Sequence, residues 1–325
     1  MDIYYFPWVG TTNQYPARFK EILSTFSNVK ELKIKVLLKE LLKLNFQRHD
    51  AVVLNWFESR LINQKGNVSL KGVLDLFFRL IILRLKFKKV IFIRHNRYPH
   101  ETNERMIPLV IWLIKLASFL PTNLVTHSPI IDFNNHEYVP HPLYSYPLIG
   151  QASLADTSST YFIFGRINRY KKIEEVIEVF PSNKKLVIVG SCDDRNYLDE
   201  LYALSGNYGN ITINPSFLAD EEIKKLLSCG AGMIINHADK DMIVSGSFFY
   251  GLTVGVRMLV VKTPFLEWVE GKVSKNVLST FSNTKELGAF LEKDIFPGGY
   301  LHSDIEVINN SFGDIAVKNN ILKLL

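Results

Sequence analysis

Short, continuous apolar runs recur along the chain, and longer segments with helical spacing separate them. An apolar run of this length is typical of a strand that is buried on both faces of a parallel sheet. Strands are predicted at residues 3–6, 50–56, 89–94, 123–126, 161–164, 186–189, 211–214, 232–236 and 257–261. Helices are predicted at residues 17–26, 29–44, 70–85, 104–120, 171–179, 220–227 and 247–253, with Asp220 as an N-cap. This alternation predicts an α/β fold with right-handed crossovers.

Residues 140–160 change in character and divide the pattern. The run PHPLYSYPLIG is followed by the small polar residues of QASLADTSST, which suits a linker between domains. We therefore expect an N-terminal domain at 1–150 and a C-terminal domain at 151–304, each a doubly wound sheet. A last helix, at about 305–325, is expected to pack back on the first domain.

Charge is divided unevenly between these two parts. Residues 1–150 hold 20 Lys and Arg against 11 Asp and Glu, whereas the remainder holds 18 against 21. A basic excess suits nucleic acid, anionic lipid or a pyrophosphate-bearing substrate, and it also suits a solvated basic face. The helices at 70–86 and 104–120 combine apolar stretches with basic residues, either as membrane-binding helices or as core helices with basic flanks. These basic residues are Arg79, Arg84, Lys86, Lys88, Lys89, Arg105 and Lys115.

The sequence lacks the signals expected of several classes of protein. Cys192 and Cys229 have no CxxC partner or nearby histidine pair, so neither a disulfide scaffold nor a zinc site is expected. The start MDIYYFPWVG does not resemble a signal peptide. The apolar run at 106–114 has about half the ~20 residues of a membrane span. No GxGxxG follows the first strand and no nucleic-acid-binding module is recognised, which argues against a dinucleotide oxidoreductase and a nucleic-acid partner.

Residues suited to a diphosphate follow two predicted strands of the second domain. Gly165 would allow a ligand to approach the backbone, and Arg166 together with Lys171 or Lys172 would neutralise its charge. Residues 245–247 (SGS) begin a helix, whose free N–H groups and positive dipole end suit a phosphate. The alternatives are ordinary surface charge and an ordinary N-cap serine.

The order of these segments resembles the nucleotide-sugar domain of GT-B glycosyltransferases over about residues 160–265. The matching segments are FGRINRYKK, LVIVG, NITINPSFLADEEIKKLL and IINHADKDMIVSGSFFYGLTVGVRMLVV. The resemblance implies a GT-B fold of two Rossmann-like domains facing a central cleft. It also implies a nucleoside-diphosphate sugar donor, with a UDP-sugar favoured, and no cofactor or metal. The implied donor-binding residues are Gly165, Arg166, Lys171, Lys172, Ser216, Phe217, Ser245, Gly246 and Ser247; Phe217 suits a core position equally well.

The first half resembles exopolysaccharide transferases of this type in two short segments. VIFIRHNRYPHE resembles a strand that ends in an HN pair, and it implies His95 or Glu101 as the catalytic base. FPWVGTTNQYPARF resembles the loop that binds the acceptor. The implied acceptor-binding residues are Thr11, Thr12, Asn13 and Arg18.

The phosphate helix departs from the pattern of retaining group-1 enzymes. These carry two glutamates eight residues apart, whereas Asp241 and Phe249 stand near those positions here. The SGS element looks more like transferases related to the xanthan glucuronosyltransferase, so we expect inversion. Asp239 and Asp241 match the DxD pattern of metal-dependent transferases, but cationic side chains already serve the phosphates. Neither this pair nor Asp193 and Asp194 is expected to bind a metal.

Together these features predict a transferase that adds a sugar to a polyprenyl-diphosphate-linked oligosaccharide. The product would belong to surface polysaccharide synthesis (O-antigen, capsule or exopolysaccharide). The basic first domain would bind anionic lipid on the inner face of the plasma membrane, as a cytoplasmic, peripheral protein. The alternatives are an inactive GT-B scaffold that binds a partner transferase, and a transferase with a soluble acceptor.

Overall fold

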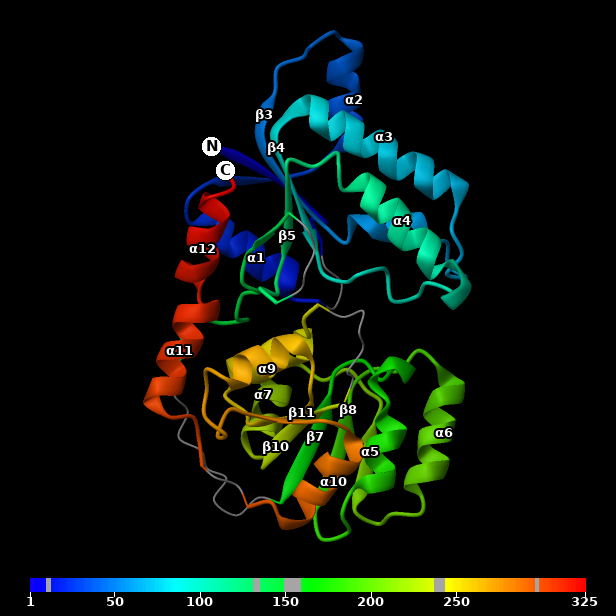
Figure 1. The fold of residues 1–325 in the computed structure, drawn as a ribbon, viewed down its shortest axis with the longest axis vertical. Helices are drawn as coiled ribbons and strands as arrows, with labels where there is room; N and C mark the ends of the chain where they lie inside the picture. The colour runs from blue at the N-terminus through cyan, green and yellow to red at the C-terminus, as the bar shows by residue number, and fades with distance from the viewer. Residues whose placement is uncertain (10–12, 131–134, 149–158, 237–242, 296–297) are drawn as a thin grey trace. The chain divides into compact units, whose positions relative to one another are not determined.

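The structure, a computed structural model, describes residues 1–325 except 10–12, 131–134, 149–158, 237–242 and 296–297 (Figure 1). The chain folds into two compact units. Unit 1 comprises Met1–Tyr144, Asp241–Val244 and Asp314–Leu325, and unit 2 comprises Ser145–Lys240 and Ser245–Gly313. Each unit is built on its own parallel six-stranded sheet.

The sheet of unit 1 has the strand order β2-β1-β3-β4-β5-β6. Its strands are β1 (Asp2–Phe6), β2 (Asn28–Glu31), β3 (His49–Asn55), β4 (Phe87–Arg94), β5 (Asn123–Thr126) and β6 (His136–Tyr138). Its helices are α1 (Tyr15–Ser24), α2 (Ile34–Leu42), α3 (Leu70–Lys86), α4 (Ile107–Ala117) and α12 (Asp314–Leu322), with 3-10 turns η1 (Phe57–Leu61) and η2 (Glu104–Met106). The strand order reverses between β1 and β3, where α/β sheets commonly bind ligands.

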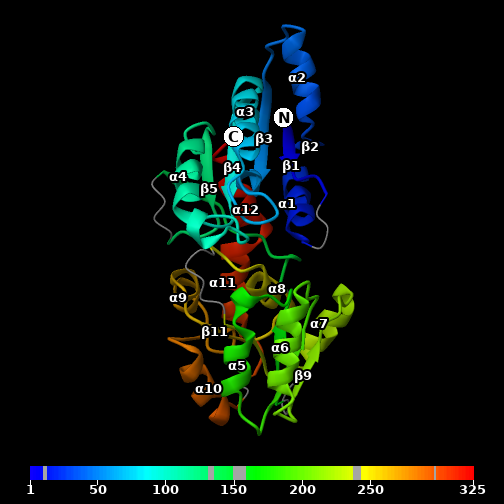
Figure 2. The ribbon, with the colours of Figure 1, turned by 90° about the vertical axis from the view of Figure 1, so that its right-hand side faces the viewer.

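Both faces of this sheet are covered by apolar side chains. In β3, Val52 and Leu54 join the core beneath α2, α3 and α4, whereas Ala51 and Val53 join the core beneath α1 and α12. Figure 1 shows α1 and α12 on one side of the strands and α3 and α4 on the other, and Figure 2 shows β1, β3 and β4 side by side. The prediction of strands buried on both faces is confirmed here.

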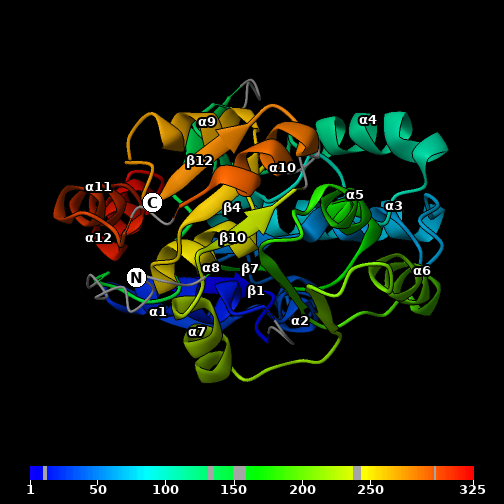
Figure 3. The ribbon, with the colours of Figure 1, turned by 90° about the horizontal axis from the view of Figure 1, so that it is seen from below.

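The sheet of unit 2 has the order β12-β11-β10-β7-β8-β9 (Figure 3). This is the strand order of the Rossmann fold, which reverses between β7 and β10. The strands are β7 (Thr160–Phe164), β8 (Lys185–Val189), β9 (Ile211–Asn214), β10 (Gly232–Ile235), β11 (Met258–Val261) and β12 (Leu278–Phe281). The helices are α5 (Ile173–Val179), α6 (Arg195–Ser205), α7 (Asp220–Ser228), α8 (Gly246–Val254), α9 (Pro264–Glu270), α10 (Thr284–Lys293) and α11 (His302–Phe312), with the turn η3 (Arg169–Lys171).

The C-terminal segment forms two helices, α11 and α12, which separate at Gly313. A Cβ atom at this position would lie 2.3 Å from the Tyr146 ring and 2.4 Å from the carbonyl oxygen of Asn309, so a side chain does not fit. α12 packs against α1 and places Val317 and Ile321 in the core of unit 1. The predicted single helix at about 305–325 is therefore interrupted.

Two local predictions are wrong. Residues 28–31 form β2 rather than the start of a helix, because they pair in parallel with β1. The segment is polar and half exposed, so its sequence alone does not predict a strand. Asp220 is the first residue of α7 and not its N-cap. Ala219 is the N-cap, and its N–H donates to Glu222 at 2.9 Å. The Asp220 carboxylate instead accepts a 2.6 Å hydrogen bond from the Tyr250 hydroxyl.

None of the helices in the described part of the chain combines the length and apolar character needed to cross a membrane.

Candidate active site

Two glycines shape the carboxyl ends of β7 and β8 in unit 2. Gly165 and Gly190 have φ angles of +97° and +147°, in the region that favours glycine. The Gly165 N–H donates to the carbonyl of Val189 at 3.0 Å. A Cβ at Gly190 would lie 2.3 Å from the carbonyl oxygen of Gly165. The two loops can therefore pass each other only with glycine here, beside the point where the strand order reverses.

Two polar side chains converge on the end of β7. The Lys171 ammonium, from η3, donates to the carbonyl of Phe164 at 3.1 Å. The Ser247 hydroxyl, from the first turn of α8, donates to the same carbonyl at 3.3 Å. A Cβ at Gly165 would lie 3.0 Å from both the Lys171 Nζ and the Ser247 Oγ. The absence of a side chain at Gly165 thus leaves the Lys171 ammonium and the Ser247 hydroxyl close to the backbone at the end of β7.

Lys171 is a buried cation without a carboxylate partner among the described residues. Burial lowers its pKa to about 7. An ammonium removed from water is costly unless a negative charge compensates it. The N-terminus of α8, where Ser245 caps the helix and Gly246 is exposed, adds positive dipole character nearby. The arrangement therefore suits an anion such as a phosphate.

The neighbouring cations differ from Lys171 because carboxylates already pair with them at the surface. Arg166 lies 2.9 Å from Asp193, and both side chains are more than half exposed. Lys172 lies 3.5 Å from Glu175 and is also exposed. The expected cationic group is thus divided into two members with surface carboxylates and one buried member that has no carboxylate partner in the part of the chain that the structure describes.

The segment after β9 presents an exposed aromatic ring. Ser216 donates its hydroxyl to the side-chain oxygen of Asn214 at 2.5 Å. Phe217 is 72% exposed, which excludes the core position that the sequence also allowed. An exposed ring at the carboxyl edge of the sheet has a free face on which a planar base can stack.

Unit 1 holds a buried aromatic cluster where β3, β4, β5 and β6 end. His95 stacks on Trp56 with ring centroids 4.1 Å apart and meets the edge of Tyr15 at 4.8 Å. His127 and His141 complete the cluster. The ring centroid of His127 lies 5.0 Å from that of His95 and 5.2 Å from that of His141. The three histidines are almost fully buried.

The hydrogen bonds around His95 assign its tautomer. The Asn55 amide nitrogen donates to the carbonyl of Phe6 at 3.0 Å, so its oxygen faces His95. The Nε2–H of His95 donates to that oxygen at 3.0 Å. The lone pair of the neutral ring therefore lies on Nδ1. Burial, followed by the charges of His127 and His141, holds the pKa of His95 well below its ordinary value, which keeps the ring neutral at pH 7.

Glu101, the other expected base, lies apart from this arrangement. It is exposed on the loop between β4 and α4. Within the described ranges, no hydrogen bond or ion pair joins it to His95. Its backbone carbonyl packs against Gly66, where an added Cβ would lie 2.1 Å from the oxygen. The structure thus places one of the two candidate bases in a polar network.

The expected acceptor-binding residues have structural partners where they are described. Arg18 is buried, donates to the carbonyl of Leu143 at 2.9 Å, and pairs with Glu21 and Asp314. The pair with Asp314 joins α1 to α12. The side-chain oxygen of Asn13 accepts from the N–H of Tyr15 at 2.9 Å.

Four predicted positions lie outside the described residues, namely Thr11, Thr12, Asp239 and Asp241. Among the described residues, no group of three or more His, Cys, Asp and Glu side chains could hold a metal ion.

Sequence reasoning missed most of the cluster around His95. Asn55, Trp56 and His127 each stand at or just after a strand that the apolar pattern predicted. Because the carboxyl ends of parallel strands meet at one edge of a sheet, polar residues in these places could have been grouped from sequence. The hydrogen bond from Tyr15 to His127, 2.9 Å long, spans 112 residues and leaves no local signal.

Several solved structures have an architecture similar to that of this chain. No family model and no curated protein matches the chain. HepE from Anabaena in complex with UDP-glucose superposes with a TM-score of 0.67 and 12% identity, over 99% of this chain and 98% of that one. The lipopolysaccharide outer core galactosyltransferase WaaB gives 0.63 and 10%, over 100% and 99%. AviGT4, a glycosyltransferase involved in avilamycin A biosynthesis, gives 0.60 and 10%, over 99% and 96%. The chain therefore has the two-domain α/β GT-B fold.

Proposed function

We propose that this chain is a glycosyltransferase that uses a nucleoside-diphosphate sugar as donor. The observation that carries the proposal is Lys171, a buried ammonium beside Ser247 and Gly165 where the strand order of a Rossmann sheet reverses. A diphosphate would supply a negative charge to compensate the Lys171 ammonium. The choice of a UDP-sugar is supported by HepE, which binds UDP and UDP-glucose.

In the proposed reaction, unit 2 stabilises the leaving group. As the bond between the sugar and the diphosphate breaks, its electron pair leaves on the phosphate oxygen. Lys171, the Ser247 hydroxyl and the first N–H groups of α8 would bind that growing charge. Arg166 and Lys172 would contribute after exchanging their surface carboxylates for phosphate. Phe217 and Ser216 would contact the base.

His95 is the proposed base. Its Nδ1 would take the proton of the acceptor hydroxyl while the acceptor oxygen bonds to the sugar carbon. Asn55 would hold the ring in the required tautomer, and its oxygen would still accept from Nε2–H once the ring is charged. Displacement by the acceptor, without a covalent intermediate, would invert the anomeric centre.

The acceptor is proposed to be a polyprenyl-diphosphate-linked oligosaccharide in surface polysaccharide synthesis. The support comes from α3 and α4, which pack together and both expose apolar side chains. These are Leu70, Leu74, Phe78, Ile81 and Leu85 on α3, and Leu109, Ile111, Trp112 and Leu116 on α4. Apolar helix faces flanked by Arg and Lys suit an anionic membrane surface. WaaB, by its name a lipopolysaccharide galactosyltransferase, supports the same class of acceptor.

One residue of the expected basic face does not belong to it. Lys86 is fully buried, pairs with Glu40 at 2.6 Å and donates to the carbonyls of Asn45 and Gln47. It holds the segment before β3 against the end of α3. The remaining basic residues on this part of the chain, Arg84 among them, are the ones proposed to meet lipid.

Donor binding is tested by thermal unfolding with UDP-, GDP-, dTDP- and CMP-sugars. A ligand at 100 times its dissociation constant adds about 2.7 kcal/mol of stability. The expected result is stabilisation by a UDP-sugar, and no shift with any of them at millimolar concentration would overturn the donor site.

Turnover and metal independence are tested with a lipid-linked acceptor. Sugar transfer that persists in EDTA is the expected result. Complete loss in EDTA, restored by Mn²⁺, would contradict a metal-free mechanism. Donor binding without transfer to lipid-linked or soluble glycans would favour an inactive scaffold.

A further inference from the structure

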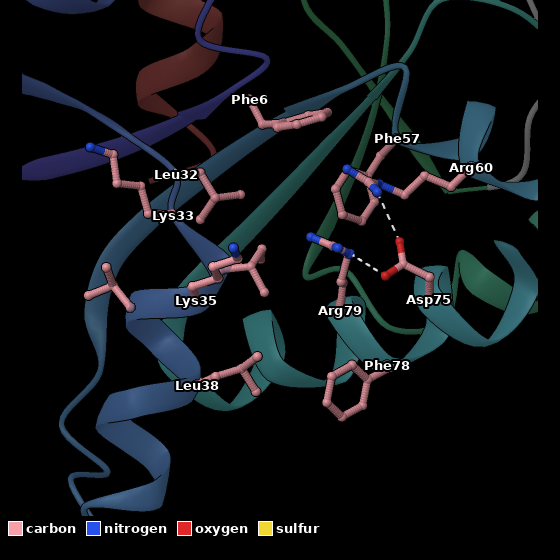
Figure 4. A pocket seen from close by; sticks show the side chains of 12 residues that line it. Phe6, Leu32, Lys33, Lys35, Leu38, Phe57, Arg60, Asp75, Phe78 and Arg79 are labelled. Atoms are coloured by element: carbon pink, nitrogen blue, oxygen red, sulfur yellow. Dashed lines mark hydrogen bonds and ion pairs between the residues drawn. The ribbon is translucent and has the colours of Figure 1, made fainter. Parts of the chain in front are cut away.

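A pocket of about 520 Å³ in unit 1 lies outside the donor-binding residues and the base assigned above (Figure 4). Phe6 ends β1, Leu32 follows β2 and Phe57 follows β3, so the pocket opens where the strand order of this sheet reverses. The first two turns of α2 and the middle of α3 form the other walls. This is the position at which α/β sheets commonly bind ligands.

The pocket carries more positive than negative charge. Asp75 shares its carboxylate between two arginines, with one oxygen 2.9 Å from Arg60 and the other 2.7 Å from Arg79. Burial alone would raise the pKa of Asp75, but these two arginines lower it below its ordinary value. One carboxylate therefore faces two guanidinium groups, and Lys35 adds a further cation to the lining.

Arg60 is held in place while part of its hydrogen-bonding capacity stays unused. Its guanidinium lies over the rings of Phe57 and Phe6, at 4.9 and 5.3 Å from their centroids. Its Nε is buried and has no hydrogen-bond acceptor among the described residues. A guanidinium offers five N–H donors in a fixed fork that matches phosphate. Figure 4 shows the guanidinium groups of Arg60 and Arg79 on the same side of the Asp75 carboxylate, each joined to it by an ion pair.

Apolar side chains form the rest of the lining and continue out of the pocket. Leu32, Leu38 and Phe78 line it, and Phe78 is half exposed. Phe78 belongs to the exposed apolar row on α3, with Leu74 one turn before it and Ile81 one turn after it. A ligand whose charged head lay at the arginines would have a continuous apolar path for its chain.

We infer that this pocket binds the diphosphate head of a lipid-linked acceptor. Arg60 and Arg79 would bind the phosphates, and the side of the pocket formed by Phe78 would contact the first isoprenoid units. The inference rests on the proposed lipid-linked acceptor and gives that acceptor a second contact besides its reacting sugar. The arginines would exchange part of their hydrogen bonding to Asp75 for the phosphate. A head with an apolar tail should therefore bind better than either part alone.

The test uses the full chain and farnesyl diphosphate, with binding measured by titration calorimetry in the presence of saturating UDP. Excess UDP fills the proposed donor site, so the remaining binding belongs elsewhere. Inorganic diphosphate and farnesol serve as the head and the tail alone. The expected result is binding of farnesyl diphosphate that is at least about tenfold tighter than that of either part.

The variants are Arg79→Gln and, as a matched control, Arg195→Gln. Both arginines pair with an aspartate four residues away on a helix. Arg79→Gln should weaken farnesyl diphosphate by at least about tenfold, as expected for one charge-assisted contact, and Arg195→Gln should not change it. Phe78→Asp, at an exposed position, provides a second variant if Arg79→Gln does not fold, and it should weaken binding similarly.

Three results would overturn the inference: no binding in the presence of UDP, equal binding of inorganic diphosphate, or unchanged affinity in both variants. A failure of the proposed function would give a different result. A chain that binds farnesyl diphosphate at Arg79 but binds no nucleotide sugar would keep this pocket and lose the donor site.

Discussion

Lys171 and His95 show how burial sets the chemistry of single residues. Both are ordinary basic side chains in sequence, and burial lowers the pKa of each. Lys171 then titrates near pH 7 and gains from an anionic ligand, whereas His95 stays neutral and keeps a lone pair on Nδ1. The proposed donor and base roles follow from these two environments.

Donor affinity should depend on pH through Lys171. The pKa of Lys171 is about 7 without ligand, and a bound diphosphate raises it by favouring the charged form. Binding above pH 7 therefore takes up a proton, and affinity for UDP-glucose should fall by up to about tenfold per pH unit. A nucleotide sugar is the right probe because it lacks the terminal phosphate that titrates near pH 6.

Calorimetric titrations between pH 6 and 9 measure this dependence. Lys171→Met should bind weakly and with little change across the range. Lys172→Met, at the exposed neighbouring position, should keep the wild-type slope. A flat pH profile in the wild-type chain would contradict the assignment of Lys171.

His95 should affect turnover rather than donor binding. General-base catalysis contributes about 10²- to 10⁴-fold, so His95→Gln should lower the rate of sugar transfer by that order. UDP-glucose binding should be unchanged, because His95 belongs to unit 1 and the donor residues belong to unit 2. His302→Gln, at an exposed position, is the control. A His95→Gln variant that transfers sugar at the wild-type rate would contradict this assignment and favour Glu101 as the base.

At the scale of elements, α3 is apolar on two faces. Leu76, Leu80 and Leu83 join the core, whereas Leu74 and Ile81 are exposed. The sequence allowed α3 to be either a core helix or a membrane-binding helix. The two roles are compatible, because different residues face the core and the solvent.

Exposed residues of α3 should control binding to anionic vesicles. The double variant Leu74→Ser, Ile81→Ser should reduce sedimentation with the vesicles and leave UDP-glucose binding unchanged. Ile315→Ser, Leu322→Ser on α12 is the control, since these side chains are also exposed on unit 1. Wild-type binding should weaken in high salt, because screening reduces attraction between the basic residues and the lipid. A wild-type chain that ignores anionic vesicles at every ionic strength would favour a soluble acceptor.

At the scale of the whole molecule, the C-terminal helix α12 packs into the core formed by the N-terminal segments of unit 1. α12 packs on α1, and the ion pair of Arg18 with Asp314 joins residues 296 positions apart. Ile321 is fully buried in the core that also contains Ile3 and Phe19. The core of unit 1 therefore depends on side chains of α12.

Ile321→Ala should destabilise unit 1 by about 2–5 kcal/mol, the usual cost of removing a buried aliphatic side chain. Ile315→Ala on the same helix removes an exposed side chain and should cost little. Urea unfolding monitored by tryptophan fluorescence compares the two, since Trp56 reports on unit 1. Equal stabilities of the two variants would contradict the packing of α12.

The sequence by itself determined the α/β class and most of the sheet strands. β3, β4, β7 and β11 contain continuous apolar runs, because parallel strands covered on both faces bury consecutive side chains. Gly165 and residues 245–247 were recognised because a glycine after a strand and a serine before a helix are local signals. Such signals depend on backbone conformation within a few residues.

The tertiary structure decided the features that depend on distant partners. β2 forms because β1 lies beside it, and Lys86 is buried because Glu40 and two carbonyls receive it. The tautomer of His95 follows from Asn55, forty residues away. Strand pairing and desolvation both arise only when segments far apart in sequence come together, so neither leaves a pattern along the chain.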